Sequence, residues 1–530
     1  MPLPYDQTPE RTGTIPTRIA PATAWFTIAT FVALIAGLPL FQLGVELSRG
    51  ERPQLFDLFD RAPDKANLRA WEDDLEKASL PKGTIQPALQ ELLSGVGGFG
   101  NNNVIIGRDG WLFYRPGLEY LAGPGILDPA RLHERRRRMI EAGERSPHPD
   151  PREAILAFHR QCDAVGARLV LMPVPDKVML QPSRLSARPA SAAPNNRDFR
   201  RLLDELRSEG VDVFDCTPDS LASGEDRFLI QDTHWTPQWM EQVAGELAAH
   251  LKPHLGPAPV VTLKAEPNEA ARAGDLVDML KLSEGQRLFL PQTVRLRRVV
   301  EAGRDWQPSH QADILFLGDS FANIYSAEIM GWGASAGLVE HLGLALRRPI
   351  DRIVRNDAGA FATRRMLGAQ LAAGKDRLAG KKVVVWEFAV RELAVGNWLP
   401  VEMKRGETPP ARFLTPEPGI ERVVSGTVEA AGVPPRPGTV PYKDHIIAVH
   451  LTDLEDEAGP IVGGQALVYV WSMRGNVLTP AAHFRPEQKI RLRLRAWADV
   501  SAKLDAINRR ELDNDEINLQ EPFWGEEVRP

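Results

Sequence analysis

The stretch Ile314-Leu-Phe-Leu-Gly-Asp-Ser-Phe-Ala322 is the part of the sequence that says most about the fold. Its four leading apolar residues predict a buried strand, and Gly318 ends that strand just before Ser320. Open α/β sheets hold their sites at the carboxyl ends of the strands, so this pattern delivers a serine to that edge. Position 322 is Ala, so the Gly-x-Ser-x-Gly elbow of one large hydrolase family is a poor fit. Ser320 is therefore either a nucleophile or only the cap of the next helix.

Similar apolar runs occur on both sides of this strand along the chain. They are continuous rather than alternating, and helical stretches separate them, which indicates a parallel sheet covered on both faces by helices. The sequence therefore predicts an α/β domain over residues 104–405. The expected strands are Arg168–Met172 (stopped by Pro173), Val211–Phe214, Ile314–Leu317, Arg352–Arg355 and Val383–Trp386.

A second motif, Asp232-Thr-His-Trp-Thr-Pro237, lies in a loop before an expected helix. Thr236 suits the N-cap and Pro237 the first helical position. Asp232 and His234 are two residues apart, so in an extended loop both side chains face the same side, and the carboxylate can fix the imidazole tautomer. A serine needs such an adjacent base to act as a nucleophile. The alternative is a solvated loop or a capping cluster.

Two further strand ends carry candidate residues. Gly359 follows the strand at 352–355 in a glycine turn, where a backbone amide either points at a developing oxyanion or only satisfies the turn. Glu387 and Arg391 follow the strand at 383–386, and they either contact substrate or pair with each other.

Composition and charge exclude several classes of protein. The chain has 530 residues, enough for two or three domains, and its 43% apolar and 25% charged residues are typical of globular proteins. Its 64 Lys and Arg against 70 Asp and Glu give a net charge of -6, which argues against nucleic-acid binding. The two cysteines, Cys162 and Cys216, lack the spacing of a zinc site, and we expect neither a metal nor a cofactor. Whether they pair in an oxidising compartment is left open.

The N-terminal part contains one long uncharged stretch, Ala24–Val45. At about 1.5 Å per residue, such a helix spans a hydrocarbon core of roughly 30 Å. Arg11 and Arg18 precede it and weakly favour a cytoplasmic N-terminus. We expect a cytoplasmic tail over residues 1–23, a membrane anchor over 24–45 and a linker over 46–103. A cleaved signal peptide is the alternative, and both interpretations export the rest of the chain.

The C-terminal part changes in character. Seven prolines between Pro409 and Pro437 disfavour helices and sheet interiors, so residues 406–439 are expected to form a linker. The runs His445–His450, Ala466–Trp471 and Lys489–Trp497 then predict a β-rich module over residues 440–530.

The block Gly318-Asp-Ser320 resembles the nucleophile block of the SGNH hydrolases, whose Asp and His usually follow near the C-terminus. Here Asp232 and His234 come first, and this order resembles the permuted SGNH-like domain of periplasmic alginate O-acetyltransferases. Further blocks agree over about residues 100–395. They are Arg108–Tyr114, Met172–Lys177, Gly331–Gly337, Arg355–Ala360 and Trp386–Phe388.

The resemblance assigns roles to the candidate residues. It implies that Ser320 is the acyl-accepting nucleophile, His234 the general base and Asp232 its orienting partner. The amide of Gly359 would join that of Ser320 in the oxyanion hole. No Gly-x-Asn-Asp block follows a strand to supply the third donor. Asn356 and Arg391 are candidates for that place, and Arg391 is also a candidate for substrate binding.

The resemblance also implies a function. It describes a single-pass inner-membrane protein with its catalytic domain in the periplasm, which acetylates hydroxyls of an exported, alginate-like polysaccharide. A separate membrane-bound O-acyltransferase would supply the acetyl group, and the module at 440–530 falls where some relatives carry a carbohydrate-binding domain. Two alternatives stay open: a polysaccharide acetyl esterase with the same triad, and a non-catalytic, polymer-binding scaffold of an export complex.

Overall fold

The computed structural model describes most of the chain, in two compact units, Met1–Leu89 and Gln90–Pro530. The described residues are 20–48, 53–59, 68, 71–72, 75, 80–144, 146–187, 190–221, 224–257, 260–356, 359–372, 374, 376–406, 413–435, 437–438, 440–461, 464–484 and 488–528.

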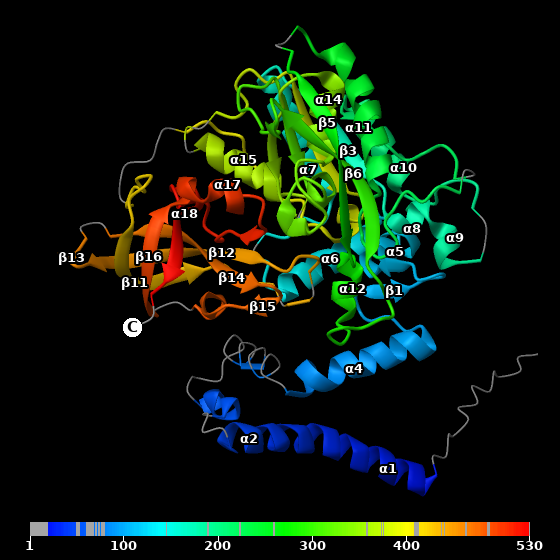
Figure 1. Cartoon of the computed structure of the whole chain (residues 1–530), viewed down its shortest axis with the longest axis vertical. Helices are drawn as coiled ribbons and strands as arrows, with labels where there is room; N and C mark the ends of the chain where they lie inside the picture. Colours follow the sequence, from blue (N-terminus) through cyan, green and yellow to red (C-terminus); the bar gives the residue numbers. More distant parts are fainter. Residues whose placement is uncertain are drawn as a thin grey trace, which may run out of the picture. The chain divides into compact units, whose positions relative to one another are not determined.

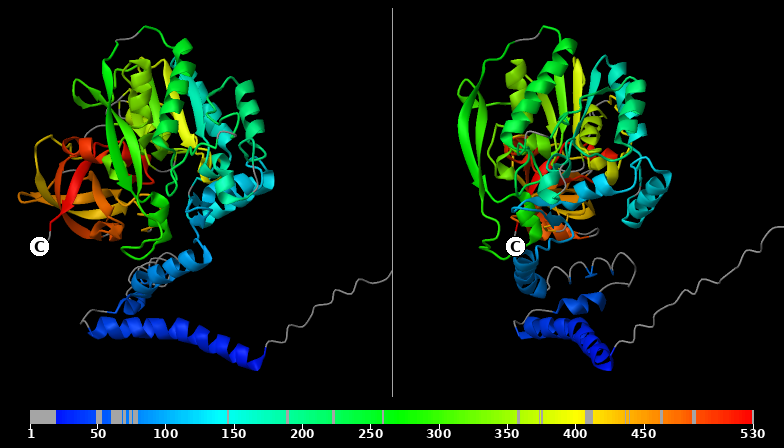
Figure 2. Two further views of the ribbon diagram at one scale, coloured as in Figure 1. Left: turned by 45° about the vertical axis from the view of Figure 1, so that its right-hand side comes forward. Right: turned by 90° about the vertical axis from the view of Figure 1, so that its right-hand side faces the viewer.

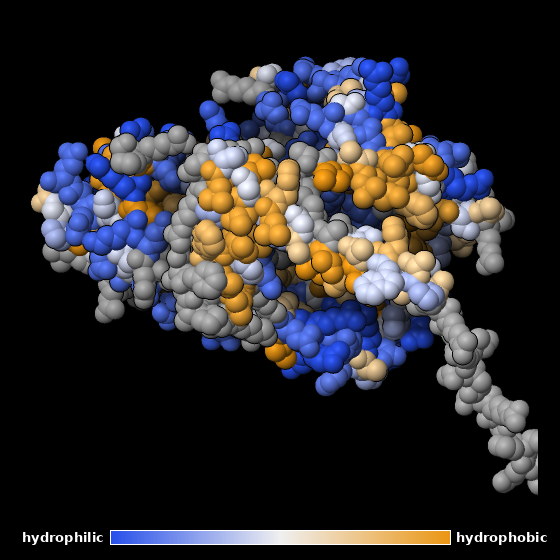
Figure 3. Space-filling model, turned by 90° about the horizontal axis from the view of Figure 1, so that it is seen from below, coloured by the Kyte–Doolittle hydropathy of each residue, from blue (hydrophilic) through white to orange (hydrophobic). Residues whose placement is uncertain are grey.

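The first unit contains a continuous apolar helix, Pro21–Ser48, of 28 residues. It consists of α1 (Pro21–Val32), a π-helical stretch η1 (Ala33–Gly37) and α2 (Leu38–Ser48), and a short 3-10 helix η2 (Gln54–Phe59) follows. Its large apolar side chains are exposed, with Trp25 71% and Phe26 73% accessible. In the view from below in Figure 3, apolar side chains gather on the face turned toward the viewer, where this helix lies. The helix is long and apolar enough to cross a membrane and encloses the expected anchor; residues 1–19 of the expected tail lie outside the described part.

The second unit is built around a five-stranded parallel sheet, in the order β4-β3-β10-β8-β9. Strand β3 is labelled in Figure 1. Almost every residue of these strands is buried, which explains why the sequence shows continuous apolar runs. The predicted α/β fold class is confirmed. The strands are β3 (Arg168–Val174), β4 (Asp212–Val213), β8 (Ile314–Gly318), β9 (Asp351–Val354) and β10 (Val383–Ala389).

Amphipathic helices flank this sheet, and Figure 2 shows helices on both of its sides. In the helix that begins at Phe199, for example, the four buried residues Phe199, Leu202, Leu203 and Leu206 recur at helical spacing. The main helices are α7 (Pro151–Ala164), α10 (Phe199–Ser208), α11 (Pro237–Leu251), α14 (Leu338–Leu346) and α15 (Ala362–Ala372).

The other elements of the chain include further helices and a small hairpin. The helical ones are α4 (Leu80–Gly97, which begins in the first unit), α5 (Arg115–Ala122), α6 (Pro129–Glu141), α8 (Lys177–Leu180), α9 (Pro182–Leu185), η3 (Lys252–His254), α12 (Asp275–Leu280), α13 (Ser320–Asn323), η4 (Glu328–Met330) and α16 (Glu392–Val395). A small hairpin comprises β1 (Val104–Ile106) and β2 (Leu112–Tyr114).

Two features of the sheet region differ from expectation. The strand expected to stop at Pro173 continues to Val174. Its neighbour β4 pairs only with Val170 and Leu171, so at Pro173 the strand has a partner on one side alone, where proline is tolerated. In addition, the sequence did not predict an antiparallel sheet formed by β5 (Leu263–Arg272), β6 (Gln292–Glu301) and β7 (Arg304–Asp305).

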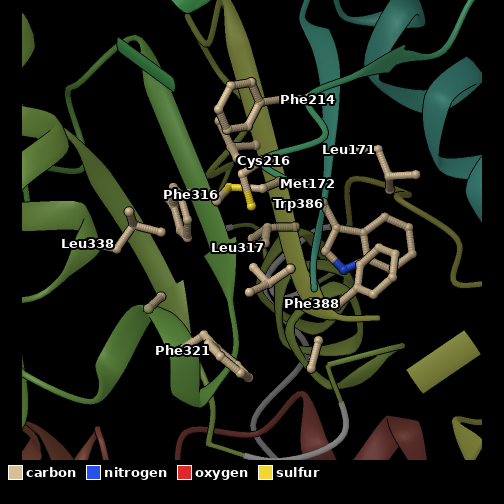
Figure 4. Packing of buried hydrophobic residues seen from close by; sticks show 14 of the residues in the cluster. Leu171, Met172, Phe214, Cys216, Phe316, Leu317, Phe321, Leu338, Trp386 and Phe388 are labelled. Atoms are coloured by element: carbon tan, nitrogen blue, oxygen red, sulfur yellow. The ribbon is translucent and has the colours of Figure 1, made fainter. Parts of the chain in front are cut away.

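The core lies between the sheet and its helices. Figure 4 shows side chains of β3, β8 and β10 meeting there, with Cys216 beside Phe214 and Met172. Cys216 and Cys162 are both buried and free, so the disulfide that the sequence left open does not form. Burial raises the pKa of both thiols.

The C-terminal part is β-rich, as predicted, and forms a closed barrel-like sheet. Its strands run in the order β13-β12-β11-β16-β18-β14-β15, and β12 also pairs with β14, which closes the ring. They are β11 (Arg422–Ala431), β12 (His445–Asp456), β13 (Gly459–Pro460), β14 (Ala466–Arg474), β15 (Val477–Leu478), β16 (Lys489–Ala496), β17 (Arg509–Arg510) and β18 (Phe523–Glu527). Helical turns complete it: η5 (Pro480–His483), η6 (Trp497–Asp499), α17 (Ser501–Leu504) and α18 (Asp515–Asn518).

Strand β11 corrects one expectation. It falls inside residues 406–439, the stretch that the prolines led us to expect as a linker. The prolines lie before and after residues 422–431, which contain none, so this segment is free to pair with β12 and β16.

Candidate functional site

The end of β8 fixes the position of Ser320. Asp319 caps the short helix α13: one carboxylate oxygen accepts from Phe321 N at 2.8 Å and the other from Ala389 N at 2.8 Å. Ser320 is thereby held at the carboxyl edge of the sheet, where β8 lies between β10 and β9. Ser320 is buried.

The loop before α11 brings His234 to this serine. Helix α11 begins at Pro237, and the Thr236 side chain accepts from Trp239 N, which confirms the predicted cap. His234 Nε2 lies 2.8 Å from Ser320 Oγ, and its Nδ1 lies 2.6 Å from Asp232 Oδ1. An ionised carboxylate only accepts hydrogen bonds, so Nδ1 carries the proton and Nε2 is left to accept from the serine. The three side chains form one continuous chain of hydrogen bonds.

Asp232 is held by more than the imidazole. Its Oδ2 accepts from Trp332 Nε1 at 3.0 Å and from Asp275 N at 3.1 Å. Burial by itself raises the pKa of the Asp232 carboxyl, but the hydrogen bond and charge of His234 outweigh it and hold that pKa below its usual range. Asp232 is therefore ionised, which is the form of a carboxylate that can orient an imidazole.

A second carboxyl group, that of Asp275, completes this cluster. Thr233 donates to it twice, from N to Oδ1 at 2.8 Å and from Oγ to Oδ2 at 2.5 Å. Burial first, and then the charge of Asp232, raise the pKa of the Asp275 carboxyl. Ligand atoms of Asp232, His234 and Asp275 lie within 4.8 Å of one another, but the hydrogen bonds given above already account for these three groups.

A pocket opens beside the hydrogen-bonded chain. Its lining includes Asp232 and His234 together with residues of the C-terminal module, so this module forms part of the wall of the site. The other lining residues are Arg272, Asp275, Ile324, Met330, Asn356, Pro441, Tyr442, Lys443, Asp444, Ile507 and Asn508.

The two oxyanion candidates lie in different surroundings. Asn356 lines the pocket, but its Oδ1 accepts from Asn323 Nδ2 at 2.7 Å and its Nδ2 donates to Ala506 O at 3.3 Å. Gly359 lies close to Asp319, the residue before Ser320, and its carbonyl accepts from Trp386 Nε1 at 3.1 Å. Gly359 therefore lies beside the turn that bears Ser320, whereas the Asn356 amide is engaged elsewhere.

Arg391 and Glu387 have partners other than each other. Arg391 forms an ion pair with Asp176 at 3.1 Å and lies over the Phe321 ring, 5.5 Å from its centroid. Glu387 Oε2 accepts from Asp319 N at 2.8 Å, and burial, followed by the charge of Asp319, raises the pKa of Glu387 well above its usual range. These contacts support the turn that carries Ser320, and Arg391 does not line the pocket described above.

Several polar residues of this region were missed by the sequence reasoning. Lys177 and Trp332 lie in blocks that carried the resemblance, so the signal was present without a role. Thr233 likewise lies inside the Asp232–Pro237 motif, where it was given no role. Asp275 gave no such signal, because only tertiary contacts bring residues 42 positions apart together.

Comparisons with known proteins agree on one family. The profile of the SGNH hydrolase-like domain of acetyltransferase AlgX matches residues 104–390, more than half of the chain. The probable alginate O-acetylase AlgJ of Pseudomonas aeruginosa is 31% identical over 236 residues, which cover 42% of this chain and 53% of that protein. The protein of the same name from Azotobacter vinelandii is 28% identical over 245 residues, covering 43% and 58%. The matches thus span little more than half of these relatives.

Two solved structures are also similar. The O-acetyltransferase domain of Pseudomonas putida AlgJ gives a TM-score of 0.41 at 23% identity, covering 56% of this chain and 93% of that domain. Pseudomonas aeruginosa AlgX gives 0.38 at 15% identity, covering 74% and 90%.

Proposed function

Because this chain belongs to the family of SGNH hydrolase-like acetyltransferase domains typified by AlgX, we propose that it is an O-acetyltransferase acting on hydroxyls of an exported, alginate-like polysaccharide. The observation that carries the proposal is the hydrogen-bonded chain Ser320–His234–Asp232 beside a pocket. The alginate O-acetylases among its relatives support the acceptor class.

The proposed mechanism has two half-reactions. His234 Nε2 takes the proton of Ser320 as Oγ attacks the acetyl carbonyl of the donor, and the bond to the leaving group breaks as His234 returns that proton. A sugar hydroxyl then attacks acetyl-Ser320, giving its proton to His234, and the acetyl ester of the sugar leaves as the serine is reprotonated. The amides of Ser320 and Gly359 are proposed to hold the oxyanion of each tetrahedral intermediate.

The N-terminal helix supports a proposed location. Pro21–Ser48 supports a single-pass anchor in the inner membrane, with the catalytic unit in the periplasm. An acetyl donor must then reach the periplasmic side, and a membrane-bound O-acyltransferase is the proposed partner that supplies it.

Acetyl trapping tests the nucleophile. The full chain in detergent is incubated with p-nitrophenyl acetate, and the acetylated peptide is located by mass spectrometry. We expect acetyl on Ser320 and its loss in Ser320→Ala, while Ser326→Ala, which removes a buried hydroxyl bonded to Glu340, serves as the matched control. Acetyl on another residue, or full turnover by Ser320→Ala, contradicts the mechanism.

Adding an acceptor separates transferase from esterase. Alginate oligosaccharides should divert acetyl from water to sugar in the unaltered protein. Hydrolysis that no acceptor alters would favour an esterase. Normal polymer acetylation in cells carrying Ser320→Ala would favour a non-catalytic scaffold.

A further inference from the structure

Lys177 is a lysine buried beside the loop that carries Asp232. It follows β3 at the start of α8 and is 1% exposed. Its Nζ donates to Ile230 O at 2.8 Å and to Asp232 O at 3.0 Å. Both acceptors are backbone carbonyls, so the ammonium group holds the main chain of this loop directly.

Aromatic rings of the β1–β2 hairpin region pack on the same ammonium group. Nζ lies 5.0 Å from the centroid of Trp111 and 5.4 Å from that of Phe113. These rings belong to Arg108–Tyr114 and the lysine to Met172–Lys177, two blocks for which the proposed mechanism has no use. The structure brings both blocks together beside the loop that contains Asp232 and His234.

Burying a lysine here is costly, and packing alone does not require it. Desolvation lowers the pKa of Lys177 to about 7, although the charges of Asp232, Asp275 and Asp176 oppose that shift. Two arginines complete the charged surroundings of Lys177. Arg391 pairs with Asp176, and the guanidinium carbon of Arg184 lies 5.2 Å from the centroid of the Trp111 ring, which also contacts the lysine. A methionine of similar length would fill the space without this cost.

We propose that Lys177 is a positioning residue for the triad, which fixes the backbone of residues 230–232 and places a positive charge beside the Asp232–His234 pair. The inference rests on the proposed function, since it concerns the same Ser320–His234–Asp232 unit. Below its pKa of about 7 the ammonium group is charged, and this charge disfavours a second positive charge on the imidazole and so favours the neutral form that acts as a base.

The consequence appears in the pH profile of serine reactivity. Lys177→Met removes the charge and both hydrogen bonds while keeping the side-chain length. The midpoint of the profile should move to higher pH by about half a unit or more, because the imidazolium form is no longer repelled. The limiting rate should fall about tenfold as the Asp232 loop loses its anchor.

Sulfonylation measures this without any sugar acceptor. The full chain reacts with phenylmethylsulfonyl fluoride from pH 5 to 9: Oγ of Ser320 bonds to sulfur, fluoride leaves, and His234 takes the hydroxyl proton. Lys381→Met is the matched control, because Lys381 is also buried and donates to two backbone carbonyls, His310 O at 2.8 Å and Ala312 O at 2.6 Å, before β8. Its midpoint should equal that of the unaltered chain.

A second variant decides the matter if Lys177→Met does not fold. Phe113→Leu withdraws one ring from the ammonium group and should move the midpoint in the same direction by less. If Lys177→Met folds and its midpoint is unchanged, the inference about Lys177 is overturned while the proposed function stands. If Lys177→Met does not fold, an unchanged midpoint in Phe113→Leu has the same meaning. No sulfonylation of Ser320 in the unaltered chain overturns the proposed function and this inference with it.

Discussion

Ser320 and His234 share one proton in the proposed mechanism, so their losses should not add. Ser320→Ala and His234→Ala should each lower kcat/KM for p-nitrophenyl acetate on the order of a thousandfold, and the double variant should cost little more. Asp232→Asn should cost less, because the amide oxygen can still accept from Trp332 or Asp275 N. Steady-state kinetics of the four variants provides the check, and additive losses would argue against a single unit.

The buried carboxyl group of Glu387 should affect how the free energy of unfolding depends on pH. Its raised pKa keeps the carboxyl protonated in the folded chain, whereas in the unfolded chain it ionises near pH 4.3. The unfolded state then binds fewer protons, so the free energy of unfolding falls as pH rises above that value, by at most about 1.4 kcal/mol per unit. Glu387→Gln keeps an acceptor for Asp319 N without this penalty. In denaturant unfolding, the free energy of unfolding of Glu387→Gln relative to that of the unaltered chain should increase from pH 5 to pH 8. A difference between the two chains that does not change with pH would contradict the prediction.

At the scale of the element, the first turn of α11 determines how the His234 loop enters a helix. Thr236→Ala removes the cap acceptor of Trp239 N and should lower the free energy of unfolding by about 1 kcal/mol, while Thr236→Ser should stay near the parent. Ester turnover per folded molecule should change little, because Thr236 lies outside the hydrogen-bonded chain. Denaturant titrations of both variants supply the measurement. Equal stability of the Ala variant would mean that Pro237 alone fixes the helix start.

The elements also show where sequence reasoning succeeds. Runs such as Ile314–Leu317 are buried on both faces, so apolar continuity alone identifies them, and their carboxyl ends give the place of Ser320. Strand β6 alternates buried and exposed residues, many of them charged, and its hairpin partner was not recognised. Lys177 looks like a surface lysine in sequence, because its burial depends on a loop 55 residues away.

At the scale of the whole molecule, the C-terminal module and the α/β domain share the pocket. Asn508 accepts from Asn356 N at 2.9 Å, yet the hydrogen bonds that join Ser320, His234 and Asp232 involve only residues before 395. A chain that ends at Arg405 should therefore keep turnover of small acetyl esters and lose transfer to oligosaccharide, as measured by paired assays with and without acceptor. Complete loss of ester turnover in a folded shortened chain would place the catalytic boundary farther along.

The two free cysteines have a consequence for how the protein is made and followed. Because Cys162 and Cys216 are unpaired, the chain needs no oxidase or disulfide isomerase to reach this fold, and a reducing cytoplasm should yield the same folded second unit. Because both thiols are buried, iodoacetamide reaches them only when the core opens. Alkylation rates followed by mass spectrometry would thus report how often the core opens. Alkylation should be slow in the folded chain and fast in any variant whose central sheet is unfolded.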